Sequence, residues 1–190
     1  GVGRPTGDIR FEAALTPERF DECIAAGRAA VESLDADLLV LGEMGIGNTT
    51  PAAAVIAALT GASPAECVGR GTGIDDEMLR HKRDVVERAV GRIGKSAPPA
   101  RVLAEVGGLE IAALAGYICA GAKAGVPVLL DGVITLAAAC AAEALWPGTM
   151  EACLASHRSV EPGASVALAH LGLVPLPRAR SPFFRLIGWK

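Results

Sequence analysis

The sequence predicts a layered α/β protein whose strands pair in parallel. Of its 190 residues, 51% are hydrophobic, which is enough to bury a sizeable core in one domain. Short apolar runs bounded by turn residues alternate with longer stretches of helical periodicity, and this order is typical of parallel strands joined by helical crossovers. Aromatic residues make up only 4% of the chain, whereas small residues are abundant, so helices and strands can approach closely.

The first half of the chain contains clear start and stop signals. Thr16 precedes Pro17 and a series of apolar residues at helical spacing, so we expect a helix to begin there. Leu38–Leu41 is short, wholly apolar and bounded by turn residues, as expected for a strand buried on both faces. Thr50 is expected to cap the next helix, which ends at Gly61.

The second half continues the alternation with longer helices. The expected elements are a short helical piece from Ser63, a charged helix from Asp75 or Asp76 to Arg92, helices at Ala100–Val106, Leu109–Ala124 and Leu136–Leu145, and strands at Pro127–Leu130 and Val166–Leu171. The longest apolar runs are shorter than the ~20 residues that span a bilayer, so we interpret them as buried helices and expect no membrane association.

Composition and charge argue against several classes of protein. A net charge of −3 and a pI near 5.7 provide no basic field for nucleic acid. The five cysteines form no CxxC pair, and we interpret them as reduced thiols of a cytoplasmic protein rather than disulfides or metal ligands. The N-terminus shows no signal-peptide pattern. The three histidines lack metal-ligand spacing, so no metal site is expected.

The glycine-rich loop Gly42–Thr50, between the first strand and the next helix, is the strongest candidate site. Backbone N–H groups around Gly45, Gly47 and Asn48 could hold a phosphate at the helix N-terminus. The loop lacks the lysine of GxxxxGK[ST] and a full GxGxxG, so neither common nucleotide fingerprint applies. From spacing alone, an ordinary strand-to-helix turn explains the pattern equally well.

Two carboxylates follow predicted strands. Ligands of parallel sheets bind beyond the carboxyl ends of the strands, and Glu43 and Asp131 are expected at that edge. Glu43 fits three roles, namely a general base in an apolar pocket, a solvated loop residue, or an acceptor for ribose hydroxyls. We rank the ribose- or substrate-orienting role first.

Basic residues supply further candidates. Lys82 lies among three other basic residues on the charged helix, and one of this group could face a phosphate. For any single member, a solvated basic face is the simpler interpretation. His157 lies in a polar loop and is the best histidine candidate for a site. His170 lies in an apolar run, which indicates a hydrogen-bonded core residue.

Six segments, taken in order, resemble one enzyme family. They are GEMGIGNTTPAAAV (42–55), Lys82 with the following Asp84–Val86, EVGGLEIAALAG (105–116), GVPVLLDG (125–132), SHRSVEPGA (156–164) and ALAHLGL (167–173). Together they are similar to nicotinate-nucleotide–dimethylbenzimidazole phosphoribosyltransferase, an enzyme of the cobalamin nucleotide-loop pathway. The resemblance covers residues 1–176.

The resemblance implies a specific reaction and assembly. The family transfers the 5-phosphoribosyl group from nicotinate mononucleotide to the base 5,6-dimethylbenzimidazole, with inversion at the anomeric carbon. The products are α-ribazole 5′-phosphate and nicotinate, and neither a metal nor another cofactor is implied. The implied fold is a three-layer, doubly wound, Rossmann-like sheet with a small helical domain, and the implied assembly is a homodimer.

The resemblance also implies roles for the candidate residues. The 5′-phosphate would bind the backbone amides of Gly45, Ile46, Gly47, Asn48 and Thr49. Lys82 would add positive charge to that phosphate, and Glu43 would line the ribose and base pocket. The nucleotide site would be lined from neighbouring strand ends by Asp131, Gly132, Ser156 and His157.

Two departures from the family pattern affect the chemistry. The family is longer at its N-terminus, which contributes benzimidazole contacts and part of the small helical domain. It also carries a GEGSGA-like segment whose glutamate is the proposed general base, whereas no glutamate follows Glu161 here. We therefore expect a phosphoribosyltransferase core at residues 1–176, an incomplete helical domain, and a divergent basic and aromatic tail at 177–190.

Three functional hypotheses follow from this sequence. The first is a truncated transferase with weak or no activity, in which Glu43 is the remaining candidate base. The second is a non-catalytic module that binds a nucleotide or phosphate. The third is a purely structural or partner-completed fragment, which predicts exposed apolar surface where the missing elements would pack.

Overall fold

The computed structural model describes residues 5–94 and 96–176, which form helices packed around a small parallel sheet. Strands β1 (Leu39–Val40), β2 (Val128–Leu130) and β3 (Cys153–Ala155) lie in the order β1-β2-β3, and both neighbouring pairs are parallel. The predicted α/β class with a parallel sheet is confirmed. The predicted boundary between a core at 1–176 and a tail at 177–190 stays a prediction, because the tail lies outside the described residues.

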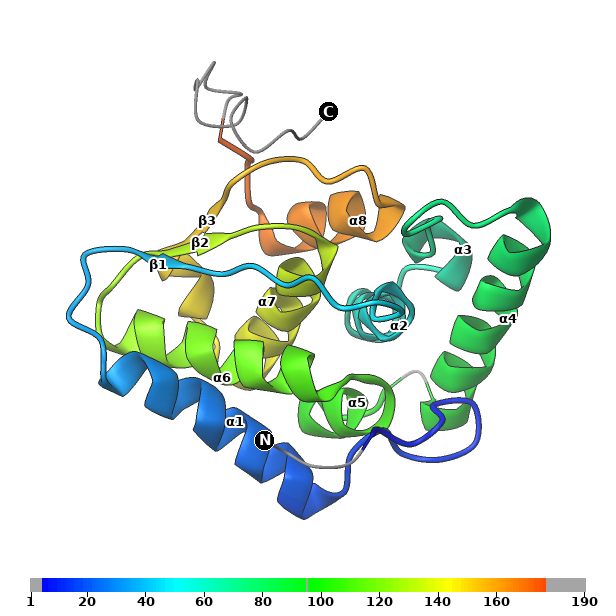
Figure 1. The fold of residues 1–190 in the computed structure, drawn as a ribbon, viewed down its shortest axis with the longest axis horizontal. Helices are drawn as coiled ribbons and strands as arrows, with labels where there is room; N and C mark the ends of the chain where they lie inside the picture. The colour runs from blue at the N-terminus through cyan, green and yellow to red at the C-terminus, as the bar shows by residue number, and fades with distance from the viewer. Residues whose placement is uncertain (1–4, 95, 177–190) are drawn as a thin grey trace.

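The helices pack against one face of the sheet and against one another. They are α1 (Pro17–Glu32), α2 (Thr49–Thr60), α3 (Pro64–Cys67), α4 (Asp76–Ile93), α5 (Pro99–Val106), α6 (Leu109–Lys123), α7 (Val133–Leu145) and α8 (Pro162–Leu171), with a 3-10 turn at Thr149–Ala152. In Figure 1, α6 runs beneath the sheet, α1 lies beneath α6, and α2 lies between α7 and α4. Within the described ranges, no helix is long and apolar enough to cross a membrane.

Most helix starts follow the predicted signals, but those of α7 and α2 do not, since α7 begins at Val133 rather than at the predicted Leu136. The side chains of Thr16 and Asp75 accept backbone hydrogen bonds at the first turns of α1 and α4, as expected for N-caps. The N-cap of α2 is Asn48 rather than Thr50. The Ala52 amide donates to the Asn48 carbonyl over 3.1 Å, so helical hydrogen bonding begins two residues earlier than predicted.

The predicted strand at Val166–Leu171 is wrong, because these residues belong to α8. Its buried positions are Gly163, Ala164, Ala167 and Leu168, which is the spacing of one helix face. A short apolar run does not distinguish a strand from a helix by periodicity, and the Pro162 start signal decides in favour of the helix. The third strand is Cys153–Ala155 instead, and His170 is exposed on α8 rather than in the core.

Glycines bring α1 and α6 into direct backbone contact. A Cβ atom on Gly27 would overlap the carbonyl oxygen of Ala113, and one on Gly116 would overlap that of Ile24. Any larger residue at either position would force the two helices apart. This contact fixes the lower layer on which α6 supports the sheet (Figure 1).

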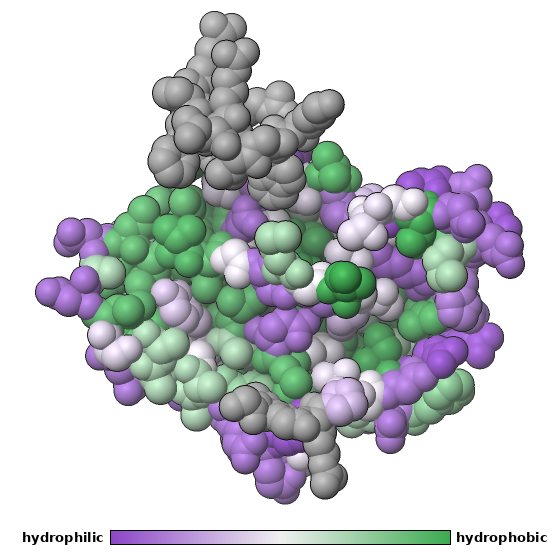
Figure 2. Space-filling view, viewed as in Figure 1, coloured by the Kyte–Doolittle hydropathy of each residue, from purple (hydrophilic) through white to green (hydrophobic). Residues whose placement is uncertain are grey.

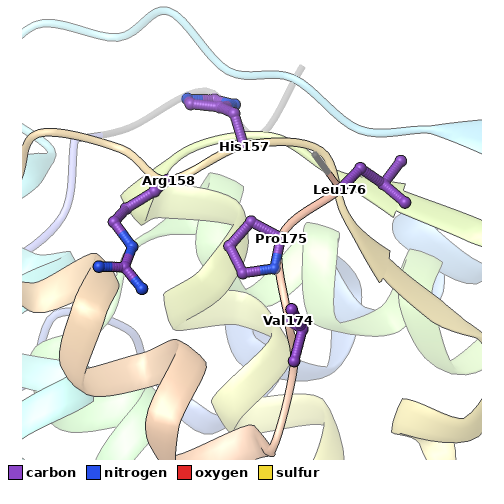
Figure 3. A pocket seen from close by; sticks show the side chains of 5 residues that line it. All are labelled: His157, Arg158, Val174, Pro175 and Leu176. Atoms are coloured by element: carbon purple, nitrogen blue, oxygen red, sulfur yellow. The ribbon is translucent and has the colours of Figure 1, made fainter. Parts of the chain in front are cut away.

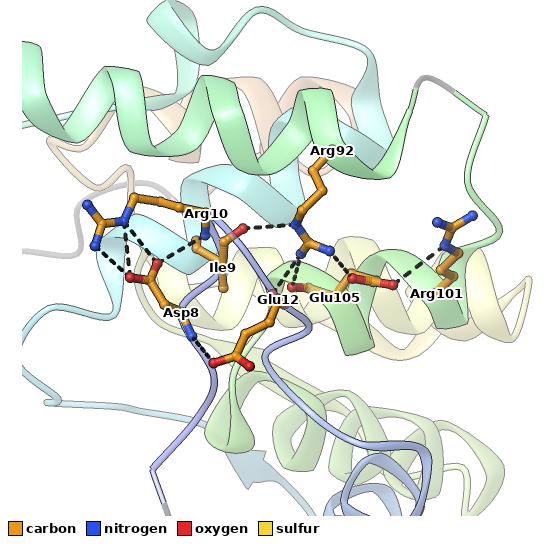
Figure 4. Close-up of polar contacts among 7 residues, drawn as sticks. All are labelled: Asp8, Ile9, Arg10, Glu12, Arg92, Arg101 and Glu105. Atoms are coloured by element: carbon orange, nitrogen blue, oxygen red, sulfur yellow. Dashed lines mark hydrogen bonds and ion pairs between the residues drawn. The ribbon is translucent and has the colours of Figure 1, made fainter.

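Arg92 ties the segment before α1 to helices α4 and α5 (Figure 4). Its guanidinium donates to the carbonyl of Ile9 over 3.3 Å and to that of Glu12 over 2.9 Å. It also donates to the Glu105 carbonyl over 3.1 Å and pairs with the Glu105 carboxylate. The planar fork of arginine therefore satisfies three backbone carbonyls and one carboxylate at once.

One face of the sheet is uncovered in the described part of the chain. Val40, Leu129 and Leu154 are neighbours in the strand register, with Val40 64% exposed and Leu154 43% exposed. The space-filling view shows hydrophobic residues gathered where the strands lie (Figure 2). Parallel sheets in proteins are normally covered on both faces, so an exposed apolar row of this kind is unusual.

All five cysteines are free and buried. Burial raises the pKa of the Cys67 thiol to about 11 and those of Cys140 and Cys153 to about 12. These thiols therefore stay protonated at neutral pH and are poor nucleophiles.

Candidate functional site

The candidate site lies at the carboxyl edge of the sheet, where the chain leaves β1 and enters α2. Gly47 has φ +88°, a conformation that favours glycine, and the space beside its Cα is open. The Met44 and Ile46 side chains are almost fully exposed, so the loop stands out from the core. Among the described residues, none accepts a hydrogen bond from the amides of Gly47 or Asn48. The start of α2 thus presents N–H groups to an anion.

The Glu43 side chain makes hydrogen bonds to other residues of this loop. Its carboxylate accepts a hydrogen bond from the Gly45 amide over 2.6 Å and another from the Asn48 side chain. The Asn48 side chain therefore points to Glu43 and does not cap α2. The amide of Gly45, which we expected to face a phosphate, is occupied by Glu43 in this structure.

Lys82 is the buried cation of the site. It is 8% exposed, and its Nζ donates to the Thr49 hydroxyl over 2.7 Å and to the Gly69 carbonyl over 2.9 Å. Burial lowers the pKa of the Lys82 ammonium, and the negative charge of Glu161 partly opposes that shift. The neighbouring His81 is exposed, as expected for a solvated basic face, whereas Lys82 is buried.

The ammonium of Lys82 has neutral partners in direct contact. Within the described ranges, no carboxylate oxygen lies within 4.0 Å of Lys82. A buried charge of this kind is stabilised by an anion in contact with it. Because Thr49 is the first residue of α2, Lys82 Nζ lies where it adds to the positive end of that helix.

A second glycine loop, Gly69–Gly73, for which no role was predicted, completes this part of the site. The Gly69 carbonyl binds Lys82, and the Gly71 amide donates to the Glu161 carboxylate over 2.8 Å. Glu161 was likewise not predicted as a site residue. A signal for it was present, since Glu161 lies inside the SHRSVEPGA segment directly before a proline that starts a helix.

The structure brings three other predicted residues together beyond β2 and β3. Parallel pairing continues past the strands, because the Ser156 amide donates to the Leu130 carbonyl over 2.9 Å. The Ser156 hydroxyl lies 2.9 Å from Nδ1 of His157, and that nitrogen lies 3.6 Å from an Asp131 carboxylate oxygen. Gly132 follows Asp131 as the N-cap of α7, with open space beside its Cα.

A pocket of about 490 Å³ adjoins this group (Figure 3). His157 and Arg158 come from the segment after β3, while Val174, Pro175 and Leu176 come from the segment after α8. Two basic side chains line one part of the pocket, and the apolar residues Val174, Pro175 and Leu176 line the rest. Only His157 was predicted from the sequence as a site residue, and Val174, Pro175 and Leu176 come near it only through the tertiary fold. Among the described residues, no cluster of three or more His, Cys, Asp or Glu is arranged to hold a metal ion.

Comparison with known proteins identifies the family. A family model described as phosphoribosyltransferase matches residues 1–180. The nicotinate-nucleotide–dimethylbenzimidazole phosphoribosyltransferase of Salinispora tropica is 52% identical over 179 residues, covering 92% of this chain and 49% of the relative. That of Chromobacterium violaceum is 48% identical, covering 89% of this chain and 50% of the relative.

Solved structures agree with these relatives. A crystal structure of CobT from Thermus thermophilus matches with a TM-score of 0.85 at 45% identity, covering 90% of this chain and 53% of that chain. This chain therefore spans about half the length of the curated relatives it matches. By sequence and by fold, the chain belongs to the nicotinate-nucleotide–dimethylbenzimidazole phosphoribosyltransferase family.

Proposed function

We propose that this chain binds nicotinate mononucleotide and carries the phosphoribosyl-donor half of a phosphoribosyltransferase site. The observation that supports this most directly is the buried Lys82 ammonium, held against Thr49 at the N-terminus of α2 without a carboxylate in contact. A 5′-phosphate at this position would receive the charge of Lys82 and the backbone N–H groups of Ile46–Thr49. Both contacts favour a negatively charged group such as a phosphate.

The sugar and base of the nucleotide would extend along the carboxyl edge of the sheet. The groups available there are acceptors on Glu43 and Asp131 and the paired side chains of Ser156 and His157. Carboxylates suit ribose hydroxyls, which donate hydrogen bonds. The backbone of Gly132 lines the same edge. This arrangement supports the sequence-based assignment of these residues to the nucleotide site.

The proposed reaction is transfer of the 5-phosphoribosyl group to 5,6-dimethylbenzimidazole, giving α-ribazole 5′-phosphate and nicotinate. A benzimidazole nitrogen forms the new bond to the anomeric carbon while the bond to the nicotinate nitrogen breaks and its electrons stay with nicotinate. The proton of the benzimidazole must pass to a base. Glu43 is the candidate base, and because its carboxylate is engaged by Gly45 and Asn48, we expect transfer to be slow. Loss of one positioned base typically costs about 10²–10⁴ in rate.

Binding and transfer are tested separately. Calorimetry measures the binding of nicotinate mononucleotide to the donor site, and absence of binding by the folded chain would refute the proposal. Chromatographic detection of α-ribazole 5′-phosphate after incubation with both substrates measures transfer. Binding without product would leave a nucleotide-binding module as the function of this chain.

A second candidate, a partner-completed transferase, is favoured by the uncovered sheet face. The row of Val40, Leu129 and Leu154 is apolar, and the relatives have about as much chain again as this one. The proposed occupant is the part of the family sequence that this chain does not span. Mixing the chain with that half of the Salinispora relative should give a heterodimer by light scattering and faster product formation. Unchanged mass and rate would remove this candidate.

The cellular location and the oligomeric state of this chain are further proposals. We propose a cytoplasmic location, supported by the five free cysteines, which suit a reducing compartment. We also propose a homodimer, as the family resemblance implies, and light scattering of the chain alone at micromolar concentration tests it.

A further inference from the structure

Glu161 makes an unusual contact for a residue that starts a helix. It is the N-cap of α8, yet its side chain makes no capping hydrogen bond to that helix. Instead, its carboxylate accepts a hydrogen bond over 2.8 Å from the amide of Gly71, which lies 90 residues earlier in the chain. The side chain thus serves the second glycine loop and leaves the first turn of α8 without a side-chain cap.

The backbone of Gly69–Gly71 is held between two opposite charges. On one side the Glu161 carboxylate binds the Gly71 amide and lies so close to Gly69 that a Cβ there would overlap it. On the other side the Gly69 carbonyl accepts from Lys82 Nζ over 2.9 Å. A Cβ on Gly71 would lie 3.2 Å from the Thr49 hydroxyl and 3.7 Å from Lys82 Nζ, so this segment directly adjoins their contact.

We propose that Glu161 is a positioning residue for the phosphate site. By holding Gly71, it fixes the Gly69 carbonyl, which in turn holds the Lys82 ammonium against Thr49 at the start of α2. Glu161 itself touches no ligand in this arrangement. The inference rests on the proposed function only in taking the ligand of Lys82 to be the phosphate of a nucleotide.

The charge of Glu161 acts in the same direction as its hydrogen bond. Burial lowers the pKa of Lys82, whereas the negative charge of Glu161 raises it and so favours the protonated form that a phosphate requires. The hydrogen bond and the charge can be separated by substitution, because glutamine keeps an oxygen acceptor and loses the charge.

The test compares Glu161→Ala, Glu161→Gln and the control Glu87→Ala, which removes a carboxylate from the exposed face of the Lys82 helix. The dissociation constants of nicotinate mononucleotide and of inorganic phosphate are measured by calorimetry. Hydrogen exchange of the Gly71 amide is followed by NMR. We expect Glu161→Ala to weaken both ligands by about tenfold, as loss of a hydrogen bond to a charged group does, and to speed Gly71 exchange.

The same argument predicts that Glu161→Gln restores most of the affinity, to within about threefold of the wild type, and retains Gly71 protection. The control should match the wild type. If the folded Glu161→Ala variant binds both ligands as the wild type does, or if Glu161→Gln is as weak as Glu161→Ala, the positioning role is wrong. Failure of the wild type itself to bind nicotinate mononucleotide contradicts the proposed function instead. Should Glu161→Ala not fold, Glu161→Asp takes its place, because it keeps the charge and shortens the side chain by one methylene; it should also weaken both ligands and speed Gly71 exchange, and wild-type values for both would contradict the positioning role.

Discussion

Replacing Lys82 by methionine should separate ligand binding from stability. Methionine has a similar length and no charge, so it fills the space of a side chain that is 8% exposed. An ammonium and a phosphate oxygen about 4 Å apart interact by about 4 kcal/mol at an effective dielectric constant of about 20. Hydration of the free phosphate offsets part of this energy, and hydrogen bonds to charged groups contribute about 1.5–3 kcal/mol net. We therefore expect a loss of about 2–3 kcal/mol, or about 30- to 150-fold in Kd for nicotinate mononucleotide.

The stability of the empty protein should change much less. Removing a buried charge relieves its desolvation cost, but it leaves the buried Gly69 carbonyl without its donor, at a cost of about 1–3 kcal/mol. These two effects oppose each other, so the free energy of unfolding should stay within about 1 kcal/mol of the wild type. Chemical denaturation measures this free energy at neutral pH.

The pH dependence of stability gives an independent check on the same substitution. The pKa of Lys82 is lower in the folded chain than in the unfolded chain because of burial. Between these two pKa values the unfolded chain binds more protons, so the wild type gains stability as pH rises through that window, relative to Lys82→Met. Below the window the cost of the buried charge is fully present.

The exposed lysine of α6 provides the matched control, Lys123→Met. It should leave both Kd and the pH dependence unchanged. A folded Lys82→Met chain that binds nicotinate mononucleotide within about threefold of the wild type would refute the view that Lys82 contacts the phosphate.

Three further predictions concern the scaffold. Gly27→Ala should destabilise the chain by about 2 kcal/mol or more, because α1 and α6 meet at Gly27. Gly91→Ala, at an open position of α4, should stabilise the chain by about 0.5–1 kcal/mol. Thermal unfolding that shifts in the same direction for both variants would contradict the packing argument. Arg92→Ala should cost about 2–4 kcal/mol, since it removes the Arg92 hydrogen bonds to the Ile9 and Glu12 carbonyls and the closer of the two ion pairs of Glu105. The exposed Arg101→Ala should cost less than about 1 kcal/mol. Equal costs in denaturant titrations would show that the contacts of Arg92 contribute little to stability. At pH 8 a thiol reagent should label Cys140 only as fast as the chain unfolds, because burial raises its pKa to about 12; labelling in the native state that is independent of stability would contradict this.

Local signals in the sequence predicted most helix boundaries and the location of the glycine loop. Thr16 and Asp75 mark helix starts because an N-cap is a property of a few adjacent residues. The same kind of signal failed where it was ambiguous. Val166–Leu171 is apolar at every position but His170, so periodicity could not distinguish a strand from a helix. A three-residue strand such as β3 carries almost no periodic signal.

For the candidate site too, some features follow from the sequence and others only from the tertiary structure. The sequence alone determined that Gly42–Thr50 leads from a strand to a helix, and that Glu43 and Asp131 follow strands whose carboxyl ends meet at one edge. These features depend on residues close together in the chain and on the parallel pairing of strands.

Only the tertiary structure shows how the charged side chains of Lys82 and Glu161 are arranged near that edge. Lys82 reaches Thr49 across 33 residues and Glu161 reaches Gly71 across 90 residues. The sequence around Lys82 reads as an exposed basic helix face, and its burial follows from the packing of α4 against α2 and α3. Contacts between residues far apart in the chain leave no periodic trace in the sequence, because they depend on how whole elements pack rather than on their neighbours.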